Sequence, residues 1–165
     1  MTILITKATE KDVHRVARMC SDWIEESRVP WPPSITEAME AWVLRCIENG
    51  YVIVATDSGR LYGVAGIVQS FLPWNQEVPI LHDQFFYVPR TRATTGERAI
   101  RAERRVPGVA NALLGALKAY AERRKMPLIM GIISGYETGK LERWYGIQGG
   151  QYIGGTLVFP AREAA

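Results

Sequence analysis

The chain has 165 residues, enough for one domain with a substantial core, and 47% of them are hydrophobic against 22% charged. This balance is typical of a globular protein and excludes extensive disorder. No run approaches the ~20 apolar residues that span a membrane, and the first residues lack the basic and apolar regions of a signal peptide. We therefore expect a cytoplasmic protein without membrane contact. The formal net charge is only +3, but six arginines fall within one short stretch: Arg90, Arg92, Arg98, Arg101, Arg104 and Arg105.

The cysteines and histidines are few. Cys20 and Cys46 each fall on the apolar face of a predicted helix. This placement favours two buried thiols over a disulfide or a metal site, which need other spacings or more ligands. With only His14 and His82 as further soft ligands, we expect no bound metal.

The first half of the chain predicts a short strand over residues 3–6 and then two helices. Thr9 caps the first helix, with Asp12 in the position of a capping box, and a second capping box over residues 34–37 opens the other, which ends at Asn49 and Gly50. A rigid proline-rich connection over residues 29–33 separates them. Apolar residues recur at helical spacing in both: Val13, Val16, Ala17, Cys20, Trp23 and Ile24, then Ile35, Ala38, Met39, Trp42, Val43, Cys46 and Ile47.

A β-hairpin follows, with strands over residues 51–56 and 61–71 and a turn at residues 57–60. Gly63 and Gly66 in the return strand indicate a bulge or a close neighbour. Residues 72–79 predict a loop that carries Trp74, and residues 81–88 predict the next strand, which Pro89 ends.

The second half predicts a helix over residues 109–124, an apolar and therefore central strand over 128–134, a short helix over 138–145 and a last strand over 151–159. Gly115 inside the long helix is expected to let the helix lie close to the sheet or to a cofactor. The order βααβββαβαβ predicts a mixed α/β fold in which the helix after Gly108 joins two parallel strands.

The segment from Arg104 to Ala110 carries the clearest chemical signal. It places a basic residue and a glycine turn directly before a new helix. Backbone N–H groups and the positive end of the helix dipole can hold a pyrophosphate there without side-chain chemistry. This pattern predicts a nucleotide-like cofactor, although an ordinary strand-to-helix turn with solvated arginines would look the same.

Two motifs resemble the GNAT superfamily of acyl-CoA-dependent N-acyltransferases, and the resemblance covers almost the whole chain. Arg105-x-x-Gly108-x-Ala110 is similar to the superfamily's pyrophosphate loop. The segment from Glu142 to Gly149 is similar to its tyrosine segment and the following glycine turn. The resemblance implies a mixed, mostly antiparallel sheet flanked by helices in a single domain over residues 1–165, with a splayed opening between the fourth and fifth strands.

The resemblance also implies acetyl-CoA as co-substrate and a direct transfer to a primary amine of a small molecule or a protein. Main-chain groups of three strand residues would hold the pantetheine arm: Phe86, Tyr87 and Val88. Six loop residues would hold the pyrophosphate: Arg105, Val106, Pro107, Gly108, Val109 and Ala110. Tyr145 would be the general acid that protonates the departing thiolate, which is chemically sound because a phenol can stabilise negative charge as it develops.

The attacking amine needs a base, for which Asp83 is the main candidate, with His82 and the pair Glu25 and Glu26 as alternatives. Because side chains alternate between the two faces of a strand, only one of His82 and Asp83 can face the opening. The chain departs from the superfamily's pattern at three places. These are an arginine-rich insertion at about 90–104, Thr138 in place of an asparagine, and the glycines Gly146 and Gly150 beside the tyrosine segment.

Two other functions stay open on the sequence. The first is a non-catalytic GNAT-fold protein that binds or assembles, which the departures near Tyr145 permit. The second is nucleic-acid binding by the arginines, against which stand the small net charge and the scarcity of interleaved aromatics. Homodimerisation through the last strand is left open as well.

Overall fold

The protein is described by a computed structural model over residues 2–27, 35–72, 75–89, 106–132 and 138–152. One five-stranded sheet organises these residues, and its spatial order, β1-β2-β3-β4-β5, follows the order along the chain. The strands are β1 (Leu4–Lys7), β2 (Gly50–Asp57), β3 (Arg60–Leu72), β4 (Asn75–Tyr87) and β5 (Leu128–Ile129). The first four pair antiparallel, and β5 pairs parallel with β4.

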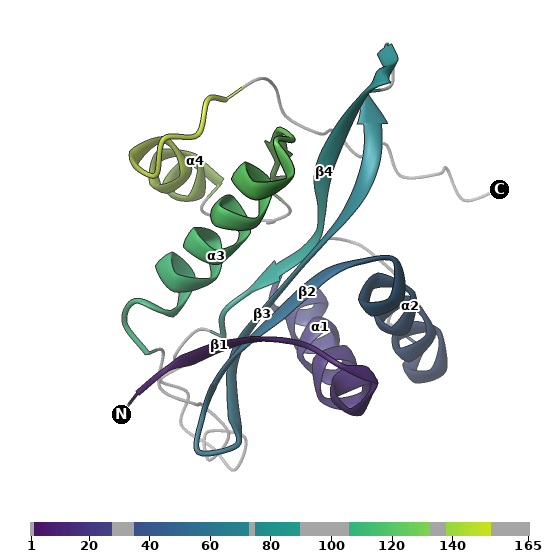
Figure 1. Ribbon diagram of the computed structural model, residues 1–165. Helices are drawn as coiled ribbons and strands as arrows, with labels where there is room; N and C mark the ends of the chain where they lie inside the picture. The colour runs from purple at the N-terminus through teal and green to yellow at the C-terminus, as the bar shows by residue number, and fades with distance from the viewer. Residues whose placement is uncertain (1, 28–34, 73–74, 90–105, 133–137, 153–165) are drawn as a thin grey trace, which may run out of the picture.

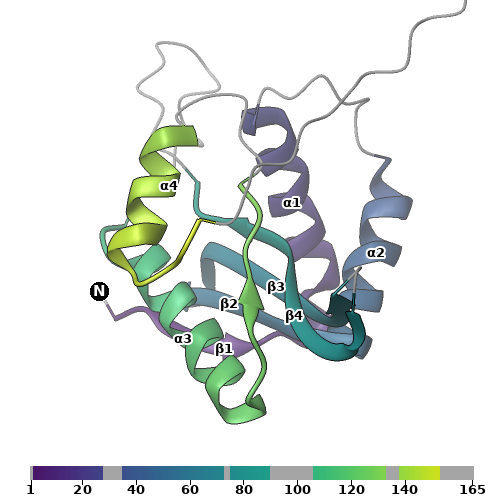
Figure 2. The ribbon, with the colours of Figure 1, turned by 90° about the horizontal axis from the view of Figure 1, so that it is seen from above.

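Helices cover both faces of the sheet (Figures 1 and 2). Helices α1 (Val13–Ser27) and α2 (Thr36–Asn49) pack on one face, and α3 (Val109–Arg124) lies on the other with α4 (Thr138–Ile147) beside it. The buried apolar side chains accordingly form two clusters, one under α1 and α2 and one under α3. The predicted mixed α/β class is confirmed, as are the element order up to α4 and the bounds of α3.

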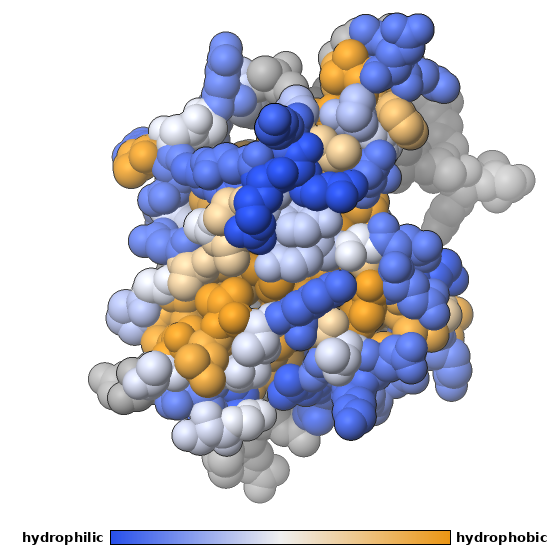
Figure 3. Space-filling model, viewed as in Figure 1, coloured by the Kyte–Doolittle hydropathy of each residue, from blue (hydrophilic) through white to orange (hydrophobic). Residues whose placement is uncertain are grey.

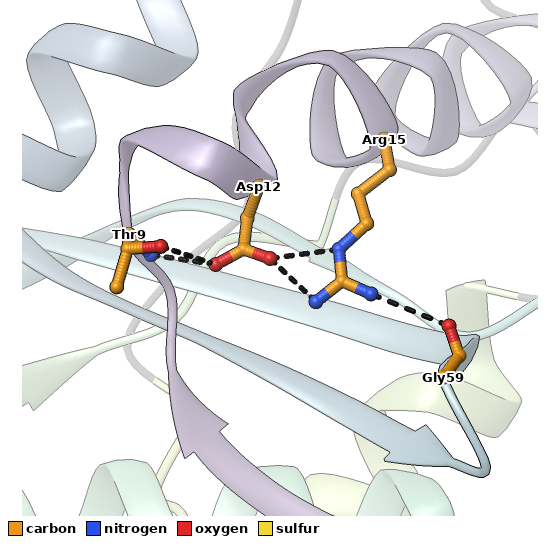
Figure 4. Close-up of polar contacts among 4 residues, drawn as sticks. All are labelled: Thr9, Asp12, Arg15 and Gly59. Carbon is orange, nitrogen blue, oxygen red and sulfur yellow. Dashed lines mark hydrogen bonds and ion pairs between the residues drawn. The ribbon is translucent and has the colours of Figure 1, made fainter.

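The start of α1 is fixed by a small polar network (Figure 4). The Asp12 carboxylate accepts hydrogen bonds from the Thr9 backbone N–H at 2.7 Å and from the Thr9 hydroxyl at 3.0 Å, so Asp12 caps the turn as predicted. Asp12 also pairs with Arg15, whose guanidinium reaches the carbonyl of Gly59 at 3.5 Å. Although burial acts to raise it, these hydrogen bonds lower the pKa of the Asp12 carboxyl. The network therefore ties α1 to the β2–β3 turn.

Helix α2 begins one residue later than the predicted capping box requires. Its N-cap is Ile35, which has no side chain able to cap, while Ser34 lies outside the described residues. The predicted inner face is confirmed at Met39, Val43, Cys46 and Ile47, but the Ile35 side chain is exposed. Cys20 and Cys46 are buried free thiols, as predicted. Burial raises the pKa of both, that of Cys46 to about 11.

The β2–β3 hairpin forms as predicted, and its return strand passes directly under an aromatic ring. A Cβ atom added at Gly66 would lie 2.5 Å from Phe85 Cζ. Phe85 is fully buried, and the Trp42 ring packs against it edge-on at a centroid distance of 5.3 Å. Glycine is therefore required at this position by a close neighbour, one of the two alternatives that the sequence left open.

The predicted loop over residues 72–79 is wrong. Strand β4 begins at Asn75 and pairs with β3 from its first residue, Leu72 with Asn75 and Phe71 with Pro79. Pro79 is accepted in the strand because β4 has only β3 as a strand neighbour there, among the described residues, so no ladder on the other side needs its missing N–H. The proline and the polar residues around it thus mark the solvated end of a long hairpin.

The predicted strand over residues 128–134 is shorter than expected, since β5 ends at Ile129; residues 133–134, and the predicted last strand that would make it central, lie outside the described residues. Strand β5 has two residues, is half-buried, and is the outermost strand of the described sheet. Its apolar character reflects contact with the α3 cluster on one face. The predicted last strand cannot be compared beyond Tyr152, because residues 153–165 lie outside the described part, and Gln151 and Tyr152 are exposed and not in a strand.

Two further observations concern the helices. Gly115 does not bring α3 close to the sheet, since an added Cβ would have nothing within 4 Å. The close approach occurs instead at Gly63, where an added Cβ would lie 3.0 Å from side-chain atoms of Val109 and Leu113.

Among the described residues, no helix has the length and apolar character needed to cross a bilayer.

Substitution by alanine should have opposite effects on stability at Gly66 in β3 and at Gly115 in α3. Gly66→Ala should lower the free energy of unfolding by about 1–3 kcal/mol, because its methyl group overpacks against a ring that cannot move away. Gly115→Ala, on an open helix surface, should raise it by up to about 1 kcal/mol. Urea denaturation of both variants measures this. Equal effects of the two substitutions would contradict the close packing at Gly66.

Candidate active site

The turn before α3 has the geometry that its sequence predicts. Gly108 has φ +88° and ψ −15°, the values of the third residue of a type II turn, and Pro107 precedes it at the position where proline is favoured. The Val109 N–H reaches back to the Val106 carbonyl at 3.4 Å, which closes the turn weakly. Since a Cβ at Gly108 would meet nothing within 4 Å, glycine is needed for its backbone conformation alone.

This turn leaves the N-terminus of α3 open to a ligand. The first intrahelical hydrogen bond runs from the Ala112 N–H to the Gly108 carbonyl at 2.9 Å, so the amides of Ala110 and Asn111 precede it and point out of the helix end. The first turn of α3 contains no acidic residue. Figure 3 shows hydrophobic surface near this end and hydrophilic surface over the C-terminal half of α3. The predicted ligand Arg105 lies outside the described residues.

The neighbouring strands β4 and β5 part after two residue pairs. Leu81 pairs with Leu128 and His82 with Ile129, and the Leu81 N–H donates to the Pro127 carbonyl at 2.8 Å. Beyond them, the Asp83 side chain takes over the role of the main chain: its Oδ1 accepts the Gly131 N–H at 2.8 Å. The predicted splayed opening between the fourth and fifth strands is confirmed, and Asp83 lies at its origin.

A β-bulge changes the direction of β4 at the same place. Asp83 pairs with Ile67 and Phe85 with Gly66, so Gln84 is the extra residue. Past the bulge, Phe86 and Val88 face the α3 cluster, whereas Tyr87 belongs to the α1–α2 cluster. Within the described part of the chain, no strand pairs with the outer edge of β4 here. The main chain of the three residues predicted to hold pantetheine therefore borders the opening.

Helix α4 presents Tyr145 and ends immediately after it. Gly149 is left-handed, with φ +87°. The Gly150 N–H donates to the Tyr145 carbonyl at 2.9 Å, and the Gly149 N–H to the Gly146 carbonyl at 3.0 Å. This pair of bonds is a Schellman motif. The glycines in which the sequence departs from the superfamily's pattern thus cap the helix that carries Tyr145.

The two predicted catalytic residues are brought together. Burial raises the pKa of the Tyr145 hydroxyl, and the negative charge of Asp83 raises it further. Burial likewise raises the pKa of the Asp83 carboxyl, against the hydrogen bond from Gly131 and the positive potential of His82. Asp83 and Tyr145 therefore both hold their protons more strongly than they would in water, so the pKa values of the predicted base and the predicted acid are shifted in the same direction.

Helix α4 is tied to α3 by two hydrogen bonds. The Trp144 indole N–H donates to Asn111 Oδ1 at 3.1 Å, and Lys118 Nζ donates to the Gln148 carbonyl at 2.7 Å. The Trp144 ring also lies 6.0 Å from the Phe86 ring and 4.9 Å from the Tyr145 ring, centroid to centroid. These contacts were not predicted from the sequence. The seven-residue spacing of Asn111 and Lys118, which places both on one helix face, was the available signal.

Of the remaining candidates, the strand register places His82 away from this arrangement. His82 is half exposed and lies on the α1–α2 face, with its Nε2 3.9 Å from Asp83 Oδ1, so it is Asp83 that faces the opening. Glu25 and Glu26 end α1, the first exposed and the second half-buried. The six arginines of residues 90–105 and Trp74 lie outside the described residues. In the part that the structure describes, no three His, Cys, Asp or Glu residues gather as a metal site would require.

Comparison with known proteins supports the fold. No model of a protein family and no curated protein matches the chain. Among solved structures, the chain is similar to a predicted acetyltransferase from Clostridium acetobutylicum with acetyl-CoA (TM-score 0.70, 15% identity, 96% of each chain covered). It is also similar to a GCN5-related N-acetyltransferase from Ralstonia eutropha JMP134 (TM-score 0.69, 14% identity, 97% and 99% covered).

A third similar structure is a ribosomal-protein-alanine N-acetyltransferase from Brucella melitensis biovar Abortus 2308 (TM-score 0.64, 15% identity, 98% of this chain and 100% of that chain covered). At these identities the likeness shows the fold. The chain therefore has the GNAT fold.

The charge of Asp83 predicts that the stability difference between the parent and the Asp83→Asn variant depends on pH. Because its folded-state pKa is raised above the unfolded value near 3.8, ionisation costs stability as the pH rises through the folded-state pKa. Asp83→Asn should keep an oxygen acceptor for the Gly131 N–H and removes the charge. Its gain in unfolding free energy over the parent should therefore be largest at pH 7 and shrink as the pH falls towards 4. Denaturant titrations at these two pH values measure it, and a gain that grows on acidification would contradict the burial of this carboxylate.

Proposed function

We propose that this protein is an N-acetyltransferase that moves the acetyl group of acetyl-CoA directly to a primary amine of a small molecule or a protein. The single observation that carries the proposal is the meeting of Asp83 and Tyr145 at the β4–β5 opening, next to an open helix N-terminus. The solved relative from Clostridium acetobutylicum, which contains acetyl-CoA, supports the same assignment.

The start of α3 suits the diphosphate of coenzyme A. Val106, Pro107 and Gly108 shape the turn, and the amides from Val109 to Asn111 lie at the positive end of the helix dipole. No carboxylate in the first turn opposes an anion there. In this proposal the outer main-chain edge of Phe86, Tyr87 and Val88 binds the pantetheine arm, as an added strand would bind.

The proposed chemistry uses two proton transfers that depend on each other. The amine nitrogen forms a bond to the acetyl carbon and gives its proton to Asp83, while the carbon–sulfur bond breaks and Tyr145 gives its proton to the departing thiolate. The raised pKa of Asp83 makes it a better base for an ammonium-derived proton. Once Asp83 is neutral, it no longer opposes a phenolate at Tyr145, so proton uptake by the base favours release by the acid.

Binding of coenzyme A to the turn before α3 can be tested with a matched pair of variants. Gly108 and Gly59 both have left-handed backbones, φ +88° and +81°, and open surroundings. Gly108→Glu and Gly59→Glu therefore carry a similar backbone strain of about 1–3 kcal/mol and the same added charge. Only Gly108→Glu should weaken coenzyme A binding, by at least about tenfold in Kd. Isothermal titration calorimetry measures this, and equal affinities of the two variants would place the diphosphate elsewhere.

The role of Tyr145 is tested by Tyr145→Phe, which keeps the ring and removes the proton. The variant should bind coenzyme A with an unchanged Kd and transfer acetyl about 10²-fold more slowly. A panel of amines and peptides with detection of released thiol supplies the acceptor and the rate. Transfer at the parent rate would remove Tyr145 from the mechanism, whereas absence of saturable coenzyme A binding to the parent would overturn the proposed function.

A further inference from the structure

Trp144 stands where three elements meet. It precedes Tyr145 on α4, its indole N–H donates to Asn111 Oδ1 on α3 at 3.1 Å, and its ring lies 6.0 Å from that of Phe86 on β4. The Trp144 and Tyr145 rings are themselves 4.9 Å apart and tilted by 56°. One side chain thus touches the helix of the proposed acid, the helix of the diphosphate turn and the strand of the proposed pantetheine edge.

The α3 end of this contact is in the turn that would hold the diphosphate. Asn111 is the third residue of α3, directly after Val109 and Ala110. Lys118, two turns further along the same face, holds the C-terminal end of α4 through the Gln148 carbonyl at 2.7 Å. The C-terminal part of α4 is therefore fastened to α3 at two points, of which the Trp144–Asn111 bond lies nearer the start of α3.

Because Trp144 and Tyr145 are adjacent in α4, the Trp144–Asn111 hydrogen bond also controls the direction of the Tyr145 side chain. Adjacent residues point about 100° apart around a helix axis, so fixing the direction of one side chain fixes the rotation of the helix and the direction of the other. The Schellman motif holds the main chain of Tyr145 but leaves that rotation to side-chain contacts. With the indole held between Asn111 and Phe86, the phenol is turned towards Asp83.

We propose that Trp144 is a positioning residue for Tyr145, which it holds at the β4–β5 opening in register with a diphosphate bound at the first turn of α3. This inference rests on the proposed function and adds to it a residue that acts on the acid and touches neither the thioester nor the acceptor. Asn111 is its partner, since the hydrogen bond needs both.

The test replaces Tyr145 by 3-fluorotyrosine and follows its ¹⁹F resonance with coenzyme A as the ligand. Trp144→Phe keeps an aromatic ring against Phe86 and loses the N–H, and Asn111→Leu removes the acceptor. Trp42→Phe is the matched control, because Trp42 packs on Phe85 at 5.3 Å under α1 and α2, on the other face of the sheet. The parent and the control should each give one narrow coenzyme A-bound line. Trp144→Phe and Asn111→Leu should both give shifted or broadened lines, and Trp144→Phe should do so at a coenzyme A Kd within about twofold of the parent.

A second readout separates positioning from general stability. Acetyl transfer, or hydrolysis of acetyl-CoA where no amine is supplied, is measured for Trp144→Phe with and without Tyr145→Phe. If Trp144 acts through Tyr145, Trp144→Phe should slow the parent about tenfold and leave Tyr145→Phe unchanged.

Three results would overturn the inference alone: a parent-like ¹⁹F line in Trp144→Phe, an equal disturbance by Trp42→Phe, or a further loss of rate when Trp144→Phe is added to Tyr145→Phe. Failure of the parent to bind coenzyme A would instead overturn the proposed function on which the inference rests.

Discussion

The hydrogen bond from the Gly131 N–H to the Asp83 carboxylate is the interaction on which the rest of the site depends. It stands where main-chain pairing of β4 and β5 ends, after His82 and Ile129, and it replaces a ladder bond by a side-chain bond. The strands are thus held together up to this point and separate beyond it. The bulge at Gln84 turns β4 in the same region, because one extra residue bends the bulged strand and increases its twist. A parallel pair of strands that would otherwise close becomes an opening bordered by the main chain of β4.

Helix α3 supplies the second organising constraint. Its N-terminus carries the open amides, its inner face packs on the sheet at Gly63, and its outer face holds α4 through Asn111 and Lys118. The Pro107–Gly108 turn, the sheet and the helix of Tyr145 therefore share one rigid support. In the proposed enzyme this matters because the distance between a bound diphosphate and the reacting thioester is fixed by the cofactor, so the acid has to be fixed relative to the same helix end.

The sequence predicted those features that depend on local chemistry. The Pro107–Gly108 turn, the bounds of α3, the capping role of Asp12 and the hairpin turn all follow from backbone preferences of a few adjacent residues. Prediction from the sequence failed where the residue pattern of a solvated strand or a short strand was ambiguous. Pro79 and the polar residues near it looked like a loop because, among the described residues, this end of β4 pairs only with β3, and the apolar run after Pro127 looked like a longer strand although β5 ends at Ile129. The electrostatic interaction between Asp83 and Tyr145 joins residues 62 positions apart, which no local pattern shows.

The central claim is that the start of α3 and the β4–β5 opening together bind coenzyme A. An acetyl-CoA titration followed through the backbone ¹⁵N–¹H resonances tests it most directly. The account predicts saturable shifts, with one common Kd, at the amides from Gly108 to Asn111 and at Gly131, and none along α1. No saturation at millimolar acetyl-CoA, or shifts confined to α1 and α2, would contradict it.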